Sequence, residues 1–239
     1  MRLPKLILLF LLAVVPSFCS LAQRPKDKLL NRPYADNRSW HLGFSVGAFA
    51  QDLHFTHNGY ITDDGEQWRV EQPGYSPGFC VNGLFDLRLN KYFSLRVTPG
   101  MYFGNRDVHM LDLTTGATER QNIKSAYVVL PFDVKYHALR HGNMRPYVSA
   151  GVMPSFDVSK KRSDFFKLKT TDFFLSVGMG CDVYLPFFKF SPEIKFCVGL
   201  SDQIERDRPD LEDDPGKLKF TQSVKKATTK MFVLTFYFE

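Results

Sequence analysis

The sequence predicts an all-β protein, an eight-stranded antiparallel up-and-down transmembrane β-barrel of the outer-membrane type. Three observations lead to this prediction. Apolar and polar residues alternate in eight segments, long connections alternate with tight turns, and no apolar run after the first twenty residues approaches the roughly 18–20 residues of a transmembrane helix. Aromatic residues form 15% of the 239-residue chain, with 23 phenylalanines, which excludes a disordered protein.

The beginning of the chain has the features of a signal peptide. Arg2 and Lys5 precede an apolar stretch at 6–15, and Ser20-Leu21-Ala22 has the small-x-small pattern of a cleavage site. Bulky Phe18 argues against a lipoprotein signal at the next residue. We therefore expect three regions: a signal peptide at 1–22, a periplasmic polar segment at 23–38 and the barrel at 39–239.

Charge and cysteine content exclude some classes of protein. Without Arg2 and Lys5 the chain keeps 29 of its 31 basic residues against 25 acidic ones, a net charge of +4 that is too diffuse for a nucleic-acid partner. Cys80, Cys181 and Cys197 lack metal-ligand or CxxC spacing and are interpreted as buried small apolar residues. Whether Cys80 and Cys197 form a disulfide is left open.

Period-two alternation locates the strands. In the third segment, for example, Phe93, Leu95 and Val97 alternate with Ser94, Arg96 and Thr98. The same reading gives strands at 40–50, 79–89, 93–103, 126–138, 146–156, 173–185, 188–200 and 232–238. Long connections are expected at 52–76, 110–123, 158–170 and 202–227, and tight turns near 90–91, 139–145 and 186–187. Long loops on one side and short turns on the other are typical of outer-membrane barrels.

The apolar face is predicted to point to lipid, whereas a secreted soluble barrel would point it inward. The polar face is rich in glycine, which suits the crowded lumen of a narrow barrel. It carries both signs of charge within single strands, and aromatic residues mark the ends of the apolar face, as interfacial girdles do. The glycines are Gly43, Gly47, Gly100, Gly104, Gly151, Gly178, Gly180 and Gly199, and the aromatic residues are Trp40, Phe93, Tyr136, Phe156, Phe188 and Phe238.

The charges of the polar face are the candidate functional residues, with a structural role. If the turn at 90–92 is centred on Lys91, paired residue numbers sum to 182, so that Asp86 faces Arg96 inside the barrel. We expect these charges to form a packed ionic plug in the periplasmic half of the lumen. The set is Asp86, Arg88, Arg96, Asp133, Lys135, Asp182, Lys189, Glu193 and Lys195.

No catalytic, cofactor-binding or metal-binding residues are predicted. His54, His57 and His109 lie near one end of the expected barrel and His41 and His137 near the other, without a metalloprotease or hydrolase motif. The acidic run 210–216 lacks the spacing of a calcium loop. Lys160-Lys161-Arg162 are available for lipopolysaccharide phosphates. The expected surroundings are therefore outer-membrane lipid and lipopolysaccharide, and no small-molecule substrate is implied.

Several segments resemble the PorT (SprT) family of Bacteroidetes outer-membrane barrels. The run 83–100, with Leu95-Arg96 followed by Pro99-Gly100, is the most specific part, and 130–136, 145–151 and 236–239 are similar as well. The resemblance implies a non-enzymatic component of the type IX secretion system, which exports cargo such as secreted proteases and gliding adhesins. Its partners would be other subunits of that system. Two alternatives remain: an adhesion or binding barrel of the OmpX or OmpW kind, and an enzyme that modifies lipid A.

Overall fold

The structure, a computed structural model, describes residues 29–60, 67–72, 74–159, 168–205 and 223–239. The chain divides into two units, Met1–Leu30 and Asn31–Glu239, and the account below concerns the second. The expected signal peptide, the acidic run 210–216 and the basic stretch 160–162 lie outside the described residues. Among the residues that are described, no helix is long and apolar enough to cross a membrane.

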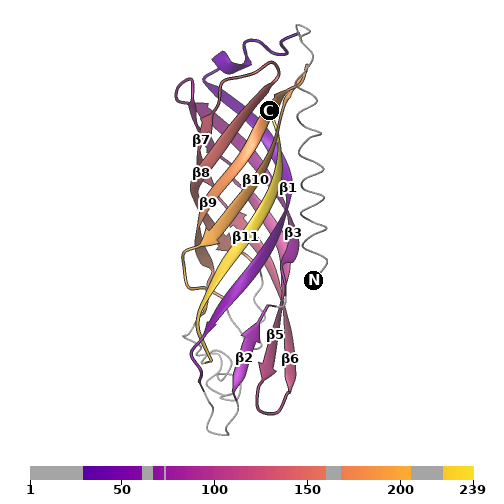
Figure 1. The fold of residues 1–239 in the computed structure, drawn as a ribbon, viewed down its shortest axis with the longest axis vertical. Coiled ribbons are helices and arrows are strands. Elements are labelled where there is room, and N and C mark those ends of the chain that lie inside the picture. Colours follow the sequence, from indigo (N-terminus) through magenta and orange to yellow (C-terminus); the bar gives the residue numbers. More distant parts are fainter. Residues whose placement is uncertain (1–28, 61–66, 73, 160–167, 206–222) are drawn as a thin grey trace, which may run out of the picture. The chain divides into compact units, whose positions relative to one another are not determined.

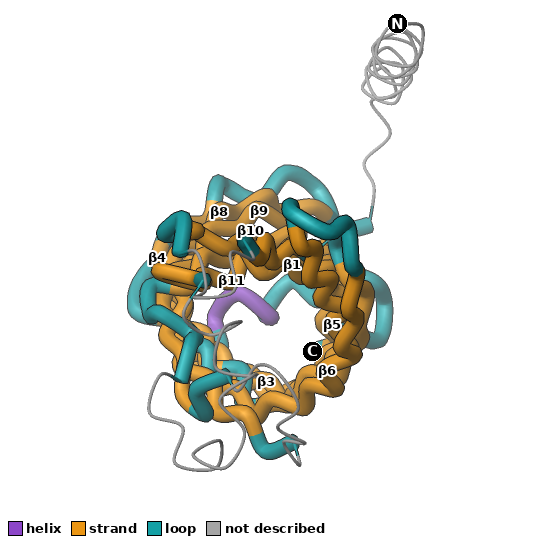
Figure 2. The backbone as a smooth tube through the Cα atoms, turned by 90° about the horizontal axis from the view of Figure 1, so that it is seen from below, coloured by secondary structure: helices purple, strands orange, loops and turns teal. Residues whose placement is uncertain are grey.

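Eleven strands form one antiparallel sheet that closes into a barrel (Figure 1, Figure 2). A short 3-10 helix, η2 (Ala35–Asn37), precedes the first strand. Closure is completed by the last strand, which pairs with the first on one side and with the tenth on the other. The strands are β1 Trp40–His57, β2 Trp68–Glu71, β3 Ser76–Arg88, β4 Phe93–Val97, β5 Gly100–Asp112, β6 Thr118–Val129, β7 Phe132–His137, β8 Met144–Asp157, β9 Thr171–Tyr184, β10 Lys189–Gly199 and β11 Val224–Phe238.

The structure therefore has eleven strands where the sequence predicted eight. Two of the additional strands arise because proline has no N–H group for the ladder. Pro99 separates β4 from β5, and Pro131 separates β6 from β7. Both interruptions are local, because the Pro99 carbonyl accepts a bond from the Gly83 N–H at 2.8 Å and the Pro131 carbonyl accepts one from the Thr98 N–H at 3.1 Å. The eleventh strand, β2, lies in the expected loop 52–76 and pairs with β5.

Three of the expected long loops are partly strand, since β11 begins at Val224, inside the expected loop 202–227. β1 has 18 residues, well beyond the roughly 9–11 that span a bilayer. β5 and β6 continue as a hairpin through most of the expected loop 110–123, and Gly116 adopts a φ of 74° at its turn. We call this extended side of the barrel the loop end. The opposite side carries the short connections 89–92, 138–143 and 185–188, and we call it the turn end.

The apolar face points outward, as predicted for a barrel in lipid. Phe44 is 56% exposed and Met179 67% exposed, whereas the inward Ser45 and Ser191 are fully buried. Inward glycines keep the interior tight. A Cβ atom at Gly151 would lie 2.5 Å from Oδ1 of Asp133, and one at Gly180 would lie 2.5 Å from the Tyr147 hydroxyl. Both distances are below van der Waals contact, so a larger residue at either position would displace lumen side chains.

The interior changes character along the barrel axis. Toward the turn end it is lined by charged and hydroxyl side chains. Toward the loop end it is an apolar core, because the apolar residues of the extended strands point inward there. The buried members of this core are Leu53, Phe55, Trp68, Val70, Val108, Met110, Leu168, Ile204, Val224 and Ala227.

The closed sheet generates the first prediction. Because every strand except β2 hydrogen-bonds to neighbours on both sides, the folded protein should resist detergent until it is heated. Unboiled and boiled samples of outer-membrane fractions should therefore migrate differently in electrophoresis. Recovery of the mature protein in the soluble periplasmic fraction would contradict this expectation.

Candidate functional site: an ionic network at the turn end

The site begins with a tight turn that fixes the register of β3 and β4. The Asn90 side chain accepts hydrogen bonds from the N–H groups of Tyr92, at 2.7 Å, and Phe93, at 2.8 Å. Asp86 is thereby paired with Arg96, and their numbers sum to 182, the register that the sequence predicts. Arg96 Nε lies 3.1 Å from Asp86 Oδ2 inside the barrel.

Arg96 is the centre of the network. Its Nη1 lies 3.2 Å from Glu193 Oε2 on β10, and its Nη2 lies 3.0 Å from Oε1 of Glu239, the residue after β11. The guanidinium also lies over the ring of Tyr237, 4.3 Å from its centroid. At 1% exposure this arginine is removed from water, and three carboxylates together with an aromatic face compensate its charge.

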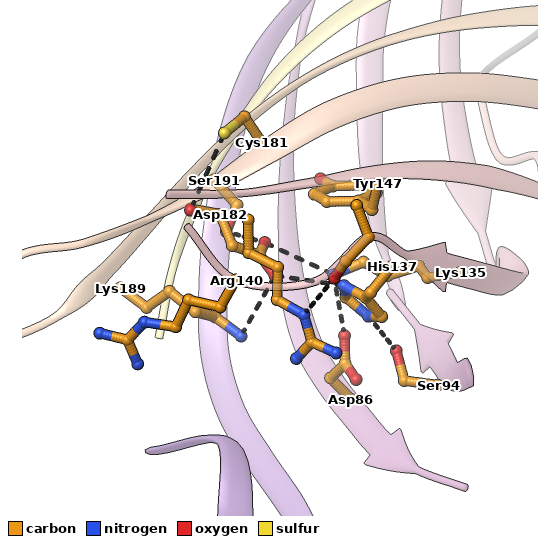
Figure 3. Close-up of polar contacts among 12 residues, drawn as sticks. Asp86, Ser94, Lys135, His137, Arg140, Tyr147, Cys181, Asp182, Lys189 and Ser191 are labelled. Atoms are coloured by element: carbon orange, nitrogen blue, oxygen red, sulfur yellow. Dashed lines mark hydrogen bonds and ion pairs between the residues drawn. The ribbon is translucent and has the colours of Figure 1, made fainter. Parts of the chain in front are cut away.

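Three buried lysines extend the network around the lumen. Lys135 Nζ lies 3.4 Å from Asp86 Oδ2 and 3.6 Å from Asp182 Oδ1, and Figure 3 shows it beside the Tyr147 ring. The other two lysines each bridge two acids as well. Lys195 contacts Asp133 at 2.6 Å and Glu193 at 3.3 Å, and Lys189 contacts Asp182 at 4.0 Å and also Glu239.

Eight of the nine expected lumen charges lie in this network, and Arg88 does not. The half-buried Arg88 side chain sits at the rim, where its Nε donates to the Asn90 carbonyl at 3.2 Å. The predicted set of lumen charges omits Glu239, and the prediction does not connect the polar-face residues Tyr147 and His137 to these charges. Glu239 shares the inward parity of Tyr237, so the alternation of β11 contained the signal that places it in the lumen.

A cap closes the turn end over this network. Figure 2 shows η2 lying across the barrel opening. Its Asp36 is 3.2 Å from Arg140, 3.1 Å from Arg145 and 2.5 Å from the Tyr184 hydroxyl. The Arg140 guanidinium in turn stacks 3.6 Å from the centroid of the Tyr184 ring. The last part of the expected polar segment 23–38 is therefore packed against the barrel.

The contacts of Asp36 persist to acidic pH. Burial raises the pKa of Asp36, but hydrogen bonds from Tyr184 and Arg140 and the charge of Arg145 outweigh it and hold this pKa below its ordinary value. A depressed folded-state pKa adds stability at pH values above the unfolded pKa, and this stability is lost as the pH falls through the folded pKa. The cap should therefore stay charged and closed at neutral and mildly acidic pH.

Little space remains between the cap and the network. A cavity of about 30 Å³ is lined by residues of both, including Asp36, His137 and Lys189. That volume is on the scale of one or two water molecules.

One polar chain in the site has the order of a hydrolytic relay. Ser94 Oγ lies 3.0 Å from His137 Nε2, and His137 Nδ1 lies 3.5 Å from Asp182 Oδ2 without a hydrogen bond between them (Figure 3). All three side chains are buried beneath the cap. The histidines of the loop end are not part of it, since His57 bonds instead to the Val70 backbone.

The three cysteines named from the sequence, Cys80, Cys181 and Cys197, are free thiols, so no Cys80–Cys197 disulfide forms in this structure. Among the described residues, no cluster of three or more His, Cys, Asp or Glu side chains has the arrangement of a metal site.

A closed antiparallel barrel with an apolar outer surface and a filled, charged interior defines an outer-membrane β-barrel protein. The chain belongs to the family described as outer membrane protein beta-barrel domain, whose model matches residues 22–205. This membership places the protein in the outer membrane. None of the curated proteins compared with the chain is significantly similar in sequence.

Three solved outer-membrane structures resemble the chain at low identity. OprG of Pseudomonas aeruginosa is 12% identical with a TM-score of 0.43, covering 83% of this chain and 91% of that one. The N-terminal β-barrel domain of Pseudomonas aeruginosa OprF is 14% identical with a TM-score of 0.37, covering 81% and 96%. Neisserial surface protein A, NspA, is 10% identical with a TM-score of 0.42, covering 84% and 98%.

The central ion pair generates a stability prediction. Asp86→Ala and Arg96→Ala should each cost roughly 3–5 kcal/mol of unfolding free energy, because each leaves buried charges without a partner. The double variant should cost less than the sum of the two. Urea unfolding of the refolded barrel measures this cycle, with Arg88→Ala as an arginine control that should change stability by less than about 1 kcal/mol. Additive single effects would show that the two charges do not interact.

The cap generates a second prediction in this region. Asp36→Asn removes a charge that holds Arg140 and Arg145, so residues 31–38 should open more often and trypsin should cleave faster after Arg38. The matched control is Asp107→Asn, which changes an exposed aspartate on β5 that is bonded to Asn122. Equal cleavage rates for wild type and Asp36→Asn would mean that these ion pairs do not hold the cap.

Proposed function

We propose that this protein is a non-enzymatic accessory component of type IX protein secretion. The observation that carries the proposal is the likeness of residues 83–100 to the PorT family, in the segment that builds the Asp86–Arg96 pair. An accessory role agrees with the interior, because a lumen filled by paired side chains and covered by η2 offers no path for a folded cargo. The protein would thus assemble, stabilise or dock other subunits.

The wall of the barrel would consist of eight passes in this proposal. β4 and β5 both pair with β3, and β6 and β7 both pair with β8, so each of these two pairs acts as one interrupted pass. β2 and β3 both pair with β5, so they too form one interrupted pass. The division of eleven strands into eight passes supports a narrow barrel whose side chains fill it.

We further propose that the turn end faces the periplasm and the loop end faces the exterior, after removal of residues 1–22. Short turns on the periplasmic side and long loops outside are the common arrangement of such barrels. The segment 23–38 would then lie at the periplasmic rim. Since Asp36 is held by the barrel, a docking surface would be the outer side of the cap, where Tyr34 is 77% exposed.

An adhesion or binding barrel of the OmpX or OmpW kind is the alternative from another class. It would act through the loop end, and the extension of β1, β5 and β6 beyond the length needed to span a bilayer favours it. Such a protein would be needed for attachment and dispensable for secretion.

A hydrolase, including one that acts on lipid A, is favoured by one observation, the Ser94–His137–Asp182 order described above. Its reaction would need the cap to open, because the cavity of about 30 Å³ cannot hold a substrate. Incubation of the folded protein with a fluorophosphonate probe tests this candidate. Labelling lost in Ser94→Ala would support it, and no labelling in wild type or in Asp36→Asn would exclude it.

Deletion of the gene separates these functions. We expect loss of secreted type IX cargo with unchanged lipid A, because the protein would support the export machinery. Secretion should be restored by the full chain and by a chain lacking residues 24–30, whose cap is intact. Normal secretion with lost adhesion would favour the loop-end alternative, and altered lipid A would favour the enzyme. Affinity purification from outer membranes should recover secretion subunits in the first case alone.

A further inference from the structure

An apolar groove lies on the outer face of the barrel where β1 meets β11. Leu42 and Phe44 of β1, Phe188 and Phe238 line it, and its volume is about 440 Å³. The Phe44 and Phe238 rings stack with centroids 5.1 Å apart, and the Phe188 ring lies 6.0 Å from that of Phe238. These rings are on the lipid-facing side, so the groove opens to the hydrocarbon of the membrane.

A second pocket adjoins this groove at the turn end. Its volume is about 550 Å³, and Leu42 and Glu239 line both pockets. The second pocket is polar where the first is apolar, because Arg32 and Arg38 line it. Trp40, which is 56% exposed, stands beside them at the start of β1, in the position of an interfacial aromatic residue.

The two arginines differ in their contacts. Arg32 Nη1 donates to the main-chain oxygen of Glu239 at 3.0 Å, and the Arg32 backbone holds a φ of 48°, the left-handed region that a non-glycine residue rarely occupies. The Arg38 side chain is exposed, and no carboxylate of the described residues lies within 4.0 Å of it. The same pocket is therefore lined by Arg32, whose guanidinium is hydrogen-bonded to Glu239, and by Arg38, whose guanidinium has no ion-pair partner among the described residues.

We propose that the two pockets together bind one phospholipid with an anionic headgroup. The phosphate lies beside Arg38 and Arg32, where charge-assisted hydrogen bonds are available, and Trp40 packs at the glycerol level. One acyl chain follows Leu42 into the groove formed by Phe44, Phe188 and Phe238. The choice of a phospholipid over lipopolysaccharide rests on the periplasmic orientation proposed above, since phospholipid forms that leaflet.

Native mass spectrometry of the full-length, detergent-purified protein tests the site. Phosphatidylglycerol should remain bound at concentrations where phosphatidylcholine of the same chain length does not. Arg38→Ala should weaken phosphatidylglycerol binding about tenfold, the effect of losing one charge-assisted contact. Arg38→Lys should retain part of it. The matched control is Lys91→Ala, which removes an exposed turn-end charge lying over Tyr92 and should leave binding unchanged.

A second ligand and a groove variant test the roles of the acyl chain and of the apolar groove. Glycerol 3-phosphate should not bind measurably, because it lacks the acyl chain, and Leu42→Trp should weaken binding by filling the groove. Equal binding of both phospholipids, or an equal loss in Arg38→Ala and Lys91→Ala, would overturn the proposal. Preferred binding of lipopolysaccharide would overturn the phospholipid assignment. Heat-modifiable migration of each variant shows that it is folded. Cargo secretion is measured in a separate experiment, so a negative lipid-binding result does not decide the secretion proposal.

Discussion

The structure depends on one constraint: within hydrocarbon, every backbone N–H and C=O must find a partner inside the protein. A sheet meets this constraint only when its last strand pairs with its first, as β11 does with β1. Closure of a small ring makes the interior narrow, which explains why Gly151 and Gly180 lie against Asp133 and Tyr147. It also means that successive side chains of a strand point alternately to the lipid outside and to the protein interior. The charge pattern of the lumen follows from this division.

At the turn end the barrel interior is filled by ion-paired side chains, whereas at the loop end it is filled by apolar side chains. Arg96 contacts three acids and each buried lysine of the network contacts two, so every acid there except Asp133 has at least two cationic partners. Such pairs add little net stability compared with an apolar core, but they define which strands lie opposite one another. At the loop end, the apolar core around Val70 and Met110 stabilises the fold by burying hydrophobic surface.

Much of this arrangement could be predicted from the sequence, because successive side chains of a regular strand point to opposite faces of the sheet. Parity placed Asp86, Arg96 and Glu193 in the lumen and Phe44 and Met179 in lipid. Strand ends were harder. The apolar parity of β1 switches from even positions such as Phe44 and Val46 to odd ones, Leu53 and Phe55, because the outer surface leaves the membrane while the interior becomes apolar. A rule that expects constant parity therefore ends the strand at Ala50.

Other features were not predicted, for different reasons. Pro99 and Pro131 divide strands without ending the passage of the chain along the wall, since their carbonyls still accept bonds. Asp36 meets Arg140, Arg145 and Tyr184 across more than one hundred residues of sequence, so nothing near Asp36 indicates the cap. Glu239 follows the inward parity of β11. It is absent from the predicted lumen charges because it comes after the last residue of the strand.

The position of Glu239 has a consequence for the order of assembly. Asp86 is ten residues from Arg96 and can meet it as soon as the hairpin forms, but Glu193 and Glu239 are 97 and 143 residues away. Arg96 therefore gains its remaining partners only when β10 and β11 arrive. Before the sheet closes, this guanidinium has only part of its final set of acidic partners. Pairing of β11 with β1 thus completes both the hydrogen bonding of the sheet and the charge compensation of Arg96.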